Sequence, residues 1–341
     1  MNRGRARPLG IANLGDFMPE MNMVQAIGSA LRCEMRRDAD VVLLGEDVGK
    51  VGGVFRVTQG LQQEFGEERV MDTPLSETGI IGTAIGMALY GLRPVPEIQF
   101  ADFIWAAFDQ LVSEAAKYRY RSGGEFACPM TVRVPVGGGI KGGHYHSQSP
   151  ESVFIHHAGL KIVCPSNPYD AKGLLASSIR DDDPVLFFEP KRTYRALKMD
   201  VPQERYEIPL GIAKVVRAGT DVTLVAWGAM LLEALAAAHS VKEQGVSAEV
   251  IDLRTLWPLD TDTLVQSVCK TGRLEVVHEA PKACDFGAEL ISQVCERAFV
   301  HLQAPPRRAT GWDTPFPYTL EYEYLPLAHR IVPALLETAR F

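Results

Sequence analysis

The chain has 341 residues, and its composition of 46% hydrophobic and 23% charged residues is typical of a globular protein. Lys and Arg number 35 and Asp and Glu 42, which leaves a formal net charge of −7 and argues against a nucleic-acid-binding surface. The six cysteines form no C-x-x-C pair, and no apolar run reaches the ~18 residues of a membrane span. We therefore expect neither a disulfide scaffold nor a nucleic-acid or membrane partner.

Residues 1–20 are predicted to form a flexible N-terminal tail. Arg3, Arg5 and Arg7 are basic, but Gly4, Pro8 and Gly10 break the segment, and it has no apolar core. It matches neither a transit peptide nor a secretory signal. A reducing compartment, the bacterial cytoplasm rather than the mitochondrial matrix, is the expected location.

Between residues 21 and 190, short apolar strands alternate with helices, a pattern that indicates a helix-covered parallel sheet. The predicted helices are 23–36, the segment after Ser76, 102–120 and 168–180. The predicted strands are 41–48, 95–100, 130–136, 160–164 and 184–188. We interpret residues 21–190 as one domain.

A linker is predicted at 191–209, where periodicity is lost. The alternation then resumes in a second domain, 210–341, with strands 222–227, 248–253 and 273–279 and helices 229–243, 261–269 and 284–298. Its aromatic, proline-rich end is expected to wrap a surface. The predicted fold class is α/β, with two open parallel-sheet domains.

A glycine-rich loop follows the strand at 130–136. Gly137, Gly139 and Gly142 match G-x-G-x-x-G, but no helix follows directly, and the next acidic residue is Glu151. A dinucleotide site needs a helix at once and an acid about 20 residues on. An NAD-binding oxidoreductase is therefore the weakest of the functions considered.

Four histidines lie near this loop: His144, His146, His156 and His157. Zinc needs three or four convergent ligands, and the spacing supplies no others, so metal binding is disfavoured. His146 lies among Ser147, Gln148 and Ser149, where proton transfer or hydrogen bonding to a ligand is one interpretation. A solvated loop histidine remains the alternative.

Two acidic residues at the ends of predicted elements are candidate functional groups. Glu46 follows an apolar strand, at the end of the sheet where such folds place their sites. Glu77 follows the N-cap candidate Ser76 at the start of a glycine-rich helix, where a capping role is the simpler explanation. Gly82 and Gly86 would leave a bare stripe on this helix, suited to close packing of another backbone.

Several long segments together resemble one family. They include LLGEDVGKVGGVFRVTQGL, DTPLSETGIIGTAIGMALYGLRPVPEIQFADF, AAKYRYRSGG, HYHSQSPE, PSNPYDAKGLL, FFEPKRTYR and EVIDLRTLWPLD. The family is the beta subunit of the thiamin-diphosphate-dependent decarboxylating component of 2-oxoacid dehydrogenases. The resemblance implies a pyrimidine-binding domain, a transketolase C-terminal-like domain and an alpha2-beta2 heterotetramer.

The segments EIQFADF, YHSQSPE and FFEPKRTYR resemble the branched-chain, or 2-oxoisovalerate, type. The resemblance implies oxidative decarboxylation of 2-oxoisovalerate-type acids and transfer of the acyl group to lipoyl groups on an acyltransferase core. A pyruvate or acetoin dehydrogenase beta subunit is the alternative within the class. A non-catalytic assembly subunit is the alternative outside it.

The resemblance also implies thiamin diphosphate with Mg²⁺ as the cofactor. Enzymes of this kind hold the Mg-diphosphate end with a G-D-G motif, which this chain lacks. The alpha subunit is therefore expected to hold that end, while this chain holds the pyrimidine ring.

Residue by residue, the resemblance assigns two catalytic groups. Glu77 matches the glutamate that hydrogen-bonds N1′ of the pyrimidine, and His146 matches a histidine implicated in proton transfer during reductive acylation of the lipoyl group. Gln99 and Phe103 are expected to line the cofactor and substrate pocket. Many relatives have tyrosine at position 103, so a hydroxyl contact is expected to be missing here.

Two further residues complete the implied cofactor site: Leu75 packs against the aminopyrimidine, and Glu46 supports Glu77 from behind. A structural potassium ion is also implied, because relatives hold one through backbone carbonyls and a carboxylate, which suit hard cations. The matching residues are Met130, Thr131, Ser178, Asp181 and Asp183.

Overall fold

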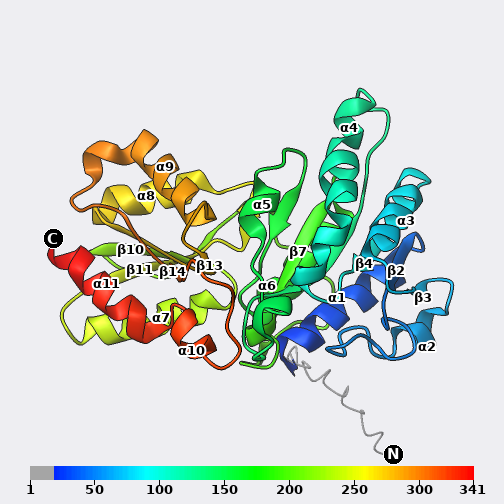
Figure 1. Ribbon diagram of the computed structural model, residues 1–341, viewed down its shortest axis with the longest axis horizontal. Helices are drawn as coiled ribbons and strands as arrows, with labels where there is room; N and C mark the ends of the chain where they lie inside the picture. Colours follow the sequence, from blue (N-terminus) through cyan, green and yellow to red (C-terminus); the bar gives the residue numbers. More distant parts are fainter. Residues whose placement is uncertain (1–18) are drawn as a thin grey trace, which may run out of the picture.

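The computed structural model describes residues 19–341 and contains two main sheets, each flanked by helices (Figure 1). The first sheet has seven strands, parallel except for the edge strand β12. In spatial order they are β12 (Thr255–Trp257), β6 (Lys161–Val163), β7 (Val185–Pro190), β5 (Thr131–Val136), β4 (Arg93–Glu97), β2 (Val41–Gly45) and β3 (Val70–Asp72).

The helices of this first unit begin where their capping residues predict. Asn22 and Gln25 form a reciprocal capping box at the start of α1, with Oδ1 of Asn22 3.0 Å from the backbone N of Gln25. Asn167 caps α6 in a similar way, and Pro168 occupies its first turn. The α-helices here are α1 (Met23–Arg37), α2 (Leu61–Phe65), α3 (Glu77–Leu89), α4 (Tyr118–Arg121), α5 (Glu151–Ile155) and α6 (Pro168–Arg180).

The predicted helix at 102–120 is wrong as a regular α-helix. The segment consists of 3₁₀ turns at Ala101–Ala107 and Ala115–Lys117, a π turn at Gln110–Glu114, and α4. The hydroxyl of Thr78 on α3 donates to the carbonyl of Ala106. A side chain that donates to a backbone carbonyl in this way interrupts the regular series of helical backbone hydrogen bonds.

Two predicted strands end earlier than expected. β2 ends at Gly45 instead of residue 48, and β4 ends at Glu97 instead of residue 100. Glu46 and Gln99 therefore lie just beyond the carboxyl edge of the sheet, where side chains are free to face a ligand.

The second sheet has five strands, in the spatial order β14 (Arg307–Gly311), β13 (Leu274–Pro281), β10 (Val222–Ala226), β11 (Ala248–Asp252) and β9 (Lys214–Arg217). β9 is antiparallel, as β12 is in the first sheet, and all other strands of the two sheets are parallel, which confirms the predicted α/β class with two open, mainly parallel sheets. The unit's helices are α7 (Met230–Lys242), α8 (Thr261–Thr271), α9 (Phe286–Ala298), α10 (Glu321–Tyr324) and α11 (Ala328–Arg340). The short edge strands β9, β12 and β14 and the helix α11 were not predicted.

The ends of the predicted tail and linker are partly ordered by pairing. Residues 1–18 of the tail lie outside the described residues. The last tail residue, Glu20, pairs with Asp200 through the short strands β1 (Glu20–Met21) and β8 (Met199–Asp200). Further along the linker, the Tyr206 hydroxyl donates to the carbonyl of Tyr169 at 2.7 Å, which holds the segment against α6.

One hydrophobic core runs continuously between the two sheets. It contains Val132 and Phe188 from the first and Val225 and Ile251 from the second, all at most 1% exposed. This shared core fixes the two units relative to each other, so a site can draw residues from both. Within residues 19–341, no helix is long and apolar enough to cross a membrane.

Candidate active site

The first sheet has a topological switch point between β2 and β4. The chain leaves β2 toward β3 on one side and leaves β4 toward β5 on the other. Such a divergence opens a crevice at the carboxyl ends of the two strands, where α/β proteins bind ligands. Glu46 and Gln99 follow these two strands, and Nε2 of Gln99 lies 3.5 Å from the carbonyl O of Glu46.

Two acidic residues, Glu46 and Glu77, lie near each other at this crevice. Ser76 caps α3, with its Oγ 3.3 Å from the backbone N of Gly79, so Glu77 is not needed as the cap. Glu77 is only 8% exposed, and Glu46 is half-buried. Burial raises the pKa of Glu46, and the nearby charges of Glu77 and Asp47 raise it further. Glu46 therefore keeps a proton more readily than an ordinary glutamate does.

Aromatic side chains surround His146. The ring of Phe100 lies edge-on to the imidazole, with centroids 4.6 Å apart, and that of Phe103 lies at 5.6 Å. The structure thus brings together the predicted residues Phe103 and His146, which are 43 positions apart in the sequence. Phe100 was not predicted, although it stands within the EIQFADF segment that indicated this region.

Asp102 holds the segment that follows His146. Its two carboxylate oxygens accept from the backbone N–H groups of Ser147 and Gln148, each at 3.3 Å. Burial raises the pKa of Asp102, while these two hydrogen bonds act in the opposite direction. Sequence reasoning missed this residue, and no local pattern distinguishes it from a first-turn acid.

Two acidic residues of the second unit hydrogen-bond to the glycine-rich loop that leads to His146. Glu279 accepts from the backbone N of Gly138 at 2.9 Å, and Glu321 accepts from those of Gly139 and Lys141 at 2.9 and 3.0 Å. Gly139 has a φ of +107°, and a Cβ there would lie 2.1 Å from Arg192. The glycine allows both the left-handed backbone and this close approach.

The outer side of α3 is left uncovered by residues 19–341. Leu75, just before the helix, is 78% exposed, and Tyr90, just after it, is 93% exposed. A Cβ added at Gly82 or Gly86 would meet no atom within 4 Å. Within the part of the chain that the structure describes, the predicted glycine stripe is therefore not covered by another backbone.

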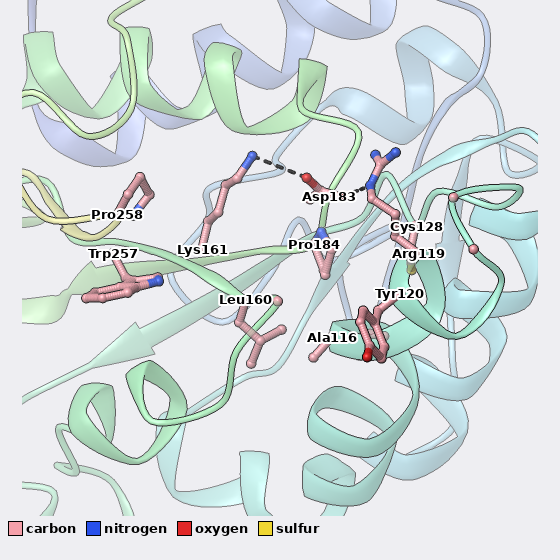
Figure 2. A pocket seen from close by; sticks show the side chains of 14 residues that line it. Ala116, Arg119, Tyr120, Cys128, Leu160, Lys161, Asp183, Pro184, Trp257 and Pro258 are labelled. Carbon is pink, nitrogen blue, oxygen red and sulfur yellow. Dashed lines mark hydrogen bonds and ion pairs between the residues drawn. The ribbon is translucent and has the colours of Figure 1, made fainter.

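The two acidic residues of the predicted cation site form ion pairs, and Figure 2 shows those of Asp183 with Lys161 and Arg119. Lys161 Nζ lies 2.7 Å from the Asp181 carboxylate and 3.6 Å from that of Asp183. Arg119 pairs with Asp183 as well. A bound cation would have to compete with these two cationic side chains, so the present arrangement offers it no uncommitted carboxylate.

The other oxygens of that set lie in the backbone. The carbonyl of Met130 accepts from Val185 N at 2.9 Å, and that of Ser178 accepts from Asp181 N at 3.2 Å. Thr131 opens β5, opposite Val185 in the neighbouring strand. A carbonyl oxygen can accept a second contact, so the potassium ion stays a prediction.

A cavity of about 660 Å³ adjoins the same ion pairs (Figure 2). Its apolar walls include Ala116, Tyr120, Leu160, Pro184, Trp257 and Pro258. Neither Glu77 nor His146 lines it, so this cavity is separate from the switch-point crevice. Within residues 19–341, no group of three or more His, Cys, Asp or Glu side chains is placed to hold a metal ion.

Comparison with known proteins gives two family matches. Residues 19–196 match the transketolase pyrimidine-binding domain, and residues 211–331 match the transketolase C-terminal domain. Among solved structures, a split-gene transketolase, an inactive beta4 tetramer, has a TM-score of 0.75 with 20% identity. That alignment covers 94% of this chain and 99% of the other, and it supports the fold alone.

Curated relatives are more similar in sequence. A 2-oxoisovalerate dehydrogenase subunit beta from Pseudomonas aeruginosa is 53% identical, covering 91% of this chain and 93% of the relative. A pyruvate dehydrogenase E1 component subunit beta from Staphylococcus epidermidis is 49% identical, covering 95% of this chain and all of the relative. Both alignments contain the crevice and the glycine-rich loop.

Proposed function

Because this chain belongs to the transketolase-like beta subunits of 2-oxoacid dehydrogenases, we propose that it is the beta half of a branched-chain 2-oxoacid decarboxylating enzyme. Its substrates would be acids of the 2-oxoisovalerate type. The observation that carries the proposal is the juxtaposition of Glu46 and Glu77 at the switch point, close enough for one charge to raise the pKa of the other carboxyl.

The residues of the crevice fit the pyrimidine ring of thiamin diphosphate. Glu77 is buried, lies beside a second acid, and is not occupied as a helix cap. Leu75 is an exposed apolar side chain two positions earlier, suited to the face of a flat ring. Gln99 reaches over the backbone of Glu46 from the other strand.

When bound, thiamin diphosphate supplies the electron sink for decarboxylation, and the protein supplies position and protons. Glu77 would hold the proton shared with N1′ of the pyrimidine. Glu46, whose pKa is raised by burial and by the charge of Glu77, would support Glu77 from behind. Phe103 would line the acyl pocket, and His146 would move a proton as the acyl group passes to a lipoyl group.

A partner subunit completes this proposal. The chain lacks G-D-G, and its described residues form no acidic metal cluster, so we assign the Mg-diphosphate end to an alpha subunit. The uncovered side of α3, from Leu75 to Tyr90, is suited to contact that subunit. We propose an alpha2-beta2 heterotetramer that delivers acyl groups to a lipoyl acyltransferase core, in the bacterial cytoplasm.

The test replaces Glu77 with Gln in the complex reconstituted with its alpha subunit. We expect assembly to be unchanged and decarboxylation of 2-oxoisovalerate to fall at least about a hundredfold, the scale of a lost general acid–base group. Glu289→Gln is the matched control, because Glu289 is an exposed acid in the first turn of α9. Full activity of Glu77→Gln would refute its role.

Substrate comparison separates the alternatives. The reconstituted complex should decarboxylate 2-oxoisovalerate faster than pyruvate or acetoin. A preference for pyruvate would support the relationship to the Staphylococcus epidermidis relative instead. A non-catalytic assembly subunit would tolerate loss of both Glu77 and His146 without any change in turnover.

A further inference from the structure

A buried lysine next to the active site has no hydrogen-bond partner among residues 19–341. Lys191 follows β7 directly in a 3₁₀ turn (Lys191–Thr193), is 4% exposed, and its Nζ contacts no acceptor. The ammonium lies 5.7 Å from the ring centroid of Phe100, the aromatic ring that contacts His146. An unpaired buried cation is costly, so its retention here calls for a role.

Three carboxylates from three different elements act on this ammonium. They are Asp102 after β4, Glu279 on β13 and Glu321 on α10, and each favours the protonated form of Lys191. Burial outweighs them and lowers the pKa of Lys191 to about 8. At neutral pH the side chain is still largely charged.

The same three carboxylates are the groups that hold the His146 loop. Glu279 and Glu321 accept from backbone N–H groups before the histidine, and Asp102 accepts from two after it. A single buried ammonium therefore balances the acids that clamp both ends of residues 137–149. Arg192 also acts on Glu279, but its guanidinium pairs with Glu233 at 2.9 Å.

We propose that Lys191 is a positioning residue for His146. The charge of Lys191 keeps Asp102, Glu279 and Glu321 as acceptors of the loop's backbone N–H groups. For its catalytic consequence this inference rests on the proposed function, whereas the effect on the loop does not. Without the ammonium, Asp102 and Glu279, whose pKa values burial already raises, lose a counter-charge and take up protons more readily. A neutral carboxyl accepts a hydrogen bond more weakly than a carboxylate, so the loop loosens.

The loop is expected to loosen without Lys191, but the free energy of unfolding of the whole chain is not expected to fall. Its folded-state pKa lies below the usual 10.5, so the buried charge destabilises the fold below about pH 8. That penalty is relieved as the pH rises from about 8 to 10.5. Replacing Lys191 with Met removes the penalty and keeps the volume, so the variant should fold.

The first experiment measures backbone hydrogen exchange across residues 137–149 in the full chain at pH 7. Lys191→Met should exchange about tenfold faster there than wild type, while strand β10 stays equally protected. Lys198→Met is the control, since Lys198 is exposed in the same segment and should behave as wild type. Equal protection of the loop in Lys191→Met and wild type would overturn the proposal.

If Lys191→Met fails to fold, hydrogen exchange of the wild-type chain measured at a series of pH values tests the same proposal. After correction for the intrinsic effect of pH, protection of residues 137–149 should fall relative to β10 between pH 7 and 9, because loss of the Lys191 proton leaves the three carboxylates to repel one another without a counter-charge. A constant ratio between loop and strand across this range would overturn the proposal.

The second experiment separates positioning from a general structural role. In the reconstituted complex, Lys191→Met should lower acyl transfer to lipoyl groups about tenfold and change CO2 release with an artificial electron acceptor much less. Lys191→Arg, which keeps the charge, should restore part of the transfer. Equal losses in both assays, or none in either, would refute the positioning role. A wild-type complex that is inactive on every 2-oxoacid would refute the proposed function. Hydrogen exchange would still test whether Lys191 holds residues 137–149 in place.

Discussion

Phe100 lies edge-on against His146, with their ring planes at 88°. The contact restricts the orientation of the imidazole, because the edge of one aromatic ring and the face of another attract each other. Phe100, which follows β4, therefore connects the switch point of the first sheet with the loop that carries His146.

Replacing Phe100 with Leu tests this contact. Leucine keeps an apolar side chain but removes the ring edge, an interaction of about 0.5–1.5 kcal/mol. We expect acyl transfer to lipoyl groups to fall several-fold at the same protein concentration, with assembly intact. Phe299→Leu is the control, because Phe299 is 70% exposed. Identical transfer rates for wild type and Phe100→Leu would contradict the positioning of His146 by this ring.

The proximity of Glu46 to Glu77 predicts a shift that needs no cofactor. Because the charge of Glu77 contributes to the raised pKa of Glu46, Glu77→Gln should lower that pKa toward its usual range. Carbon NMR of labelled glutamate side chains would measure it in the isolated chain. Glu289→Gln should leave the Glu46 titration unchanged, and an unchanged titration in Glu77→Gln would show that the two acids do not interact.

The bare face of α3 predicts opposite effects in the free chain and in the complex. Gly86→Ala should stabilise the isolated chain by up to about 1 kcal/mol, because alanine favours a helix and the added Cβ meets open space. Gly86→Leu should instead weaken co-purification with the alpha subunit. Ser292→Leu, on the exposed side of α9, is the control for a new surface leucine. Normal assembly of Gly86→Leu would place the partner elsewhere.

Glu275 predicts a specific dependence of stability on pH. Burial raises its pKa from 4.5 to about 7, against a hydrogen bond from Thr338. The folded state thus holds the proton more tightly, so this group's contribution to stability falls as the pH rises from about 4.5 to 7.

Glu275→Gln removes that loss. The variant should gain stability relative to wild type as the pH increases, with the difference approaching the order of 3 kcal/mol above pH 7. Urea unfolding at pH 5 and pH 8 would measure it. A difference that is the same at both values would mean that Glu275 does not titrate in this range.

The predicted potassium ion has its own measurement. A bound ion should raise the unfolding temperature in KCl above that in NaCl of equal ionic strength, and Asp181→Asn should remove the difference. Equal temperatures in the two salts for the wild-type chain would leave Lys161 and Arg119 as the cations that balance Asp181 and Asp183.

Most of the regular elements could be predicted from local sequence. Capping residues such as Asn22 and Asn167 and apolar runs such as 222–226 carry their signal within a few positions. The irregular segment 101–121 could not be predicted, because it depends on a hydrogen bond from the Thr78 hydroxyl to the carbonyl of Ala106, 28 positions away. The edge strands β9 and β12 have three or four residues each, too few for a periodic pattern.

The site divides along the same line. Glu46, Glu77 and His146 were predictable because each stands in a long ordered segment shared with a known family. Phe100, Asp102 and Lys191 were missed, because their importance lies in contacts and not in any local pattern. The roles assigned to all of them remain predictions for the experiments above.

The amino-acid sequence by itself determined the alternation of strands and helices, the capped start of α3 and the lack of a G-D-G motif, since each depends on neighbouring residues. Only the tertiary structure decided what surrounds His146. Glu279 and Glu321 reach Gly138 and Gly139 across 141 and 182 positions. Contacts over such separations exist only once the shared core has brought the two sheets together, so no local pattern could have shown them.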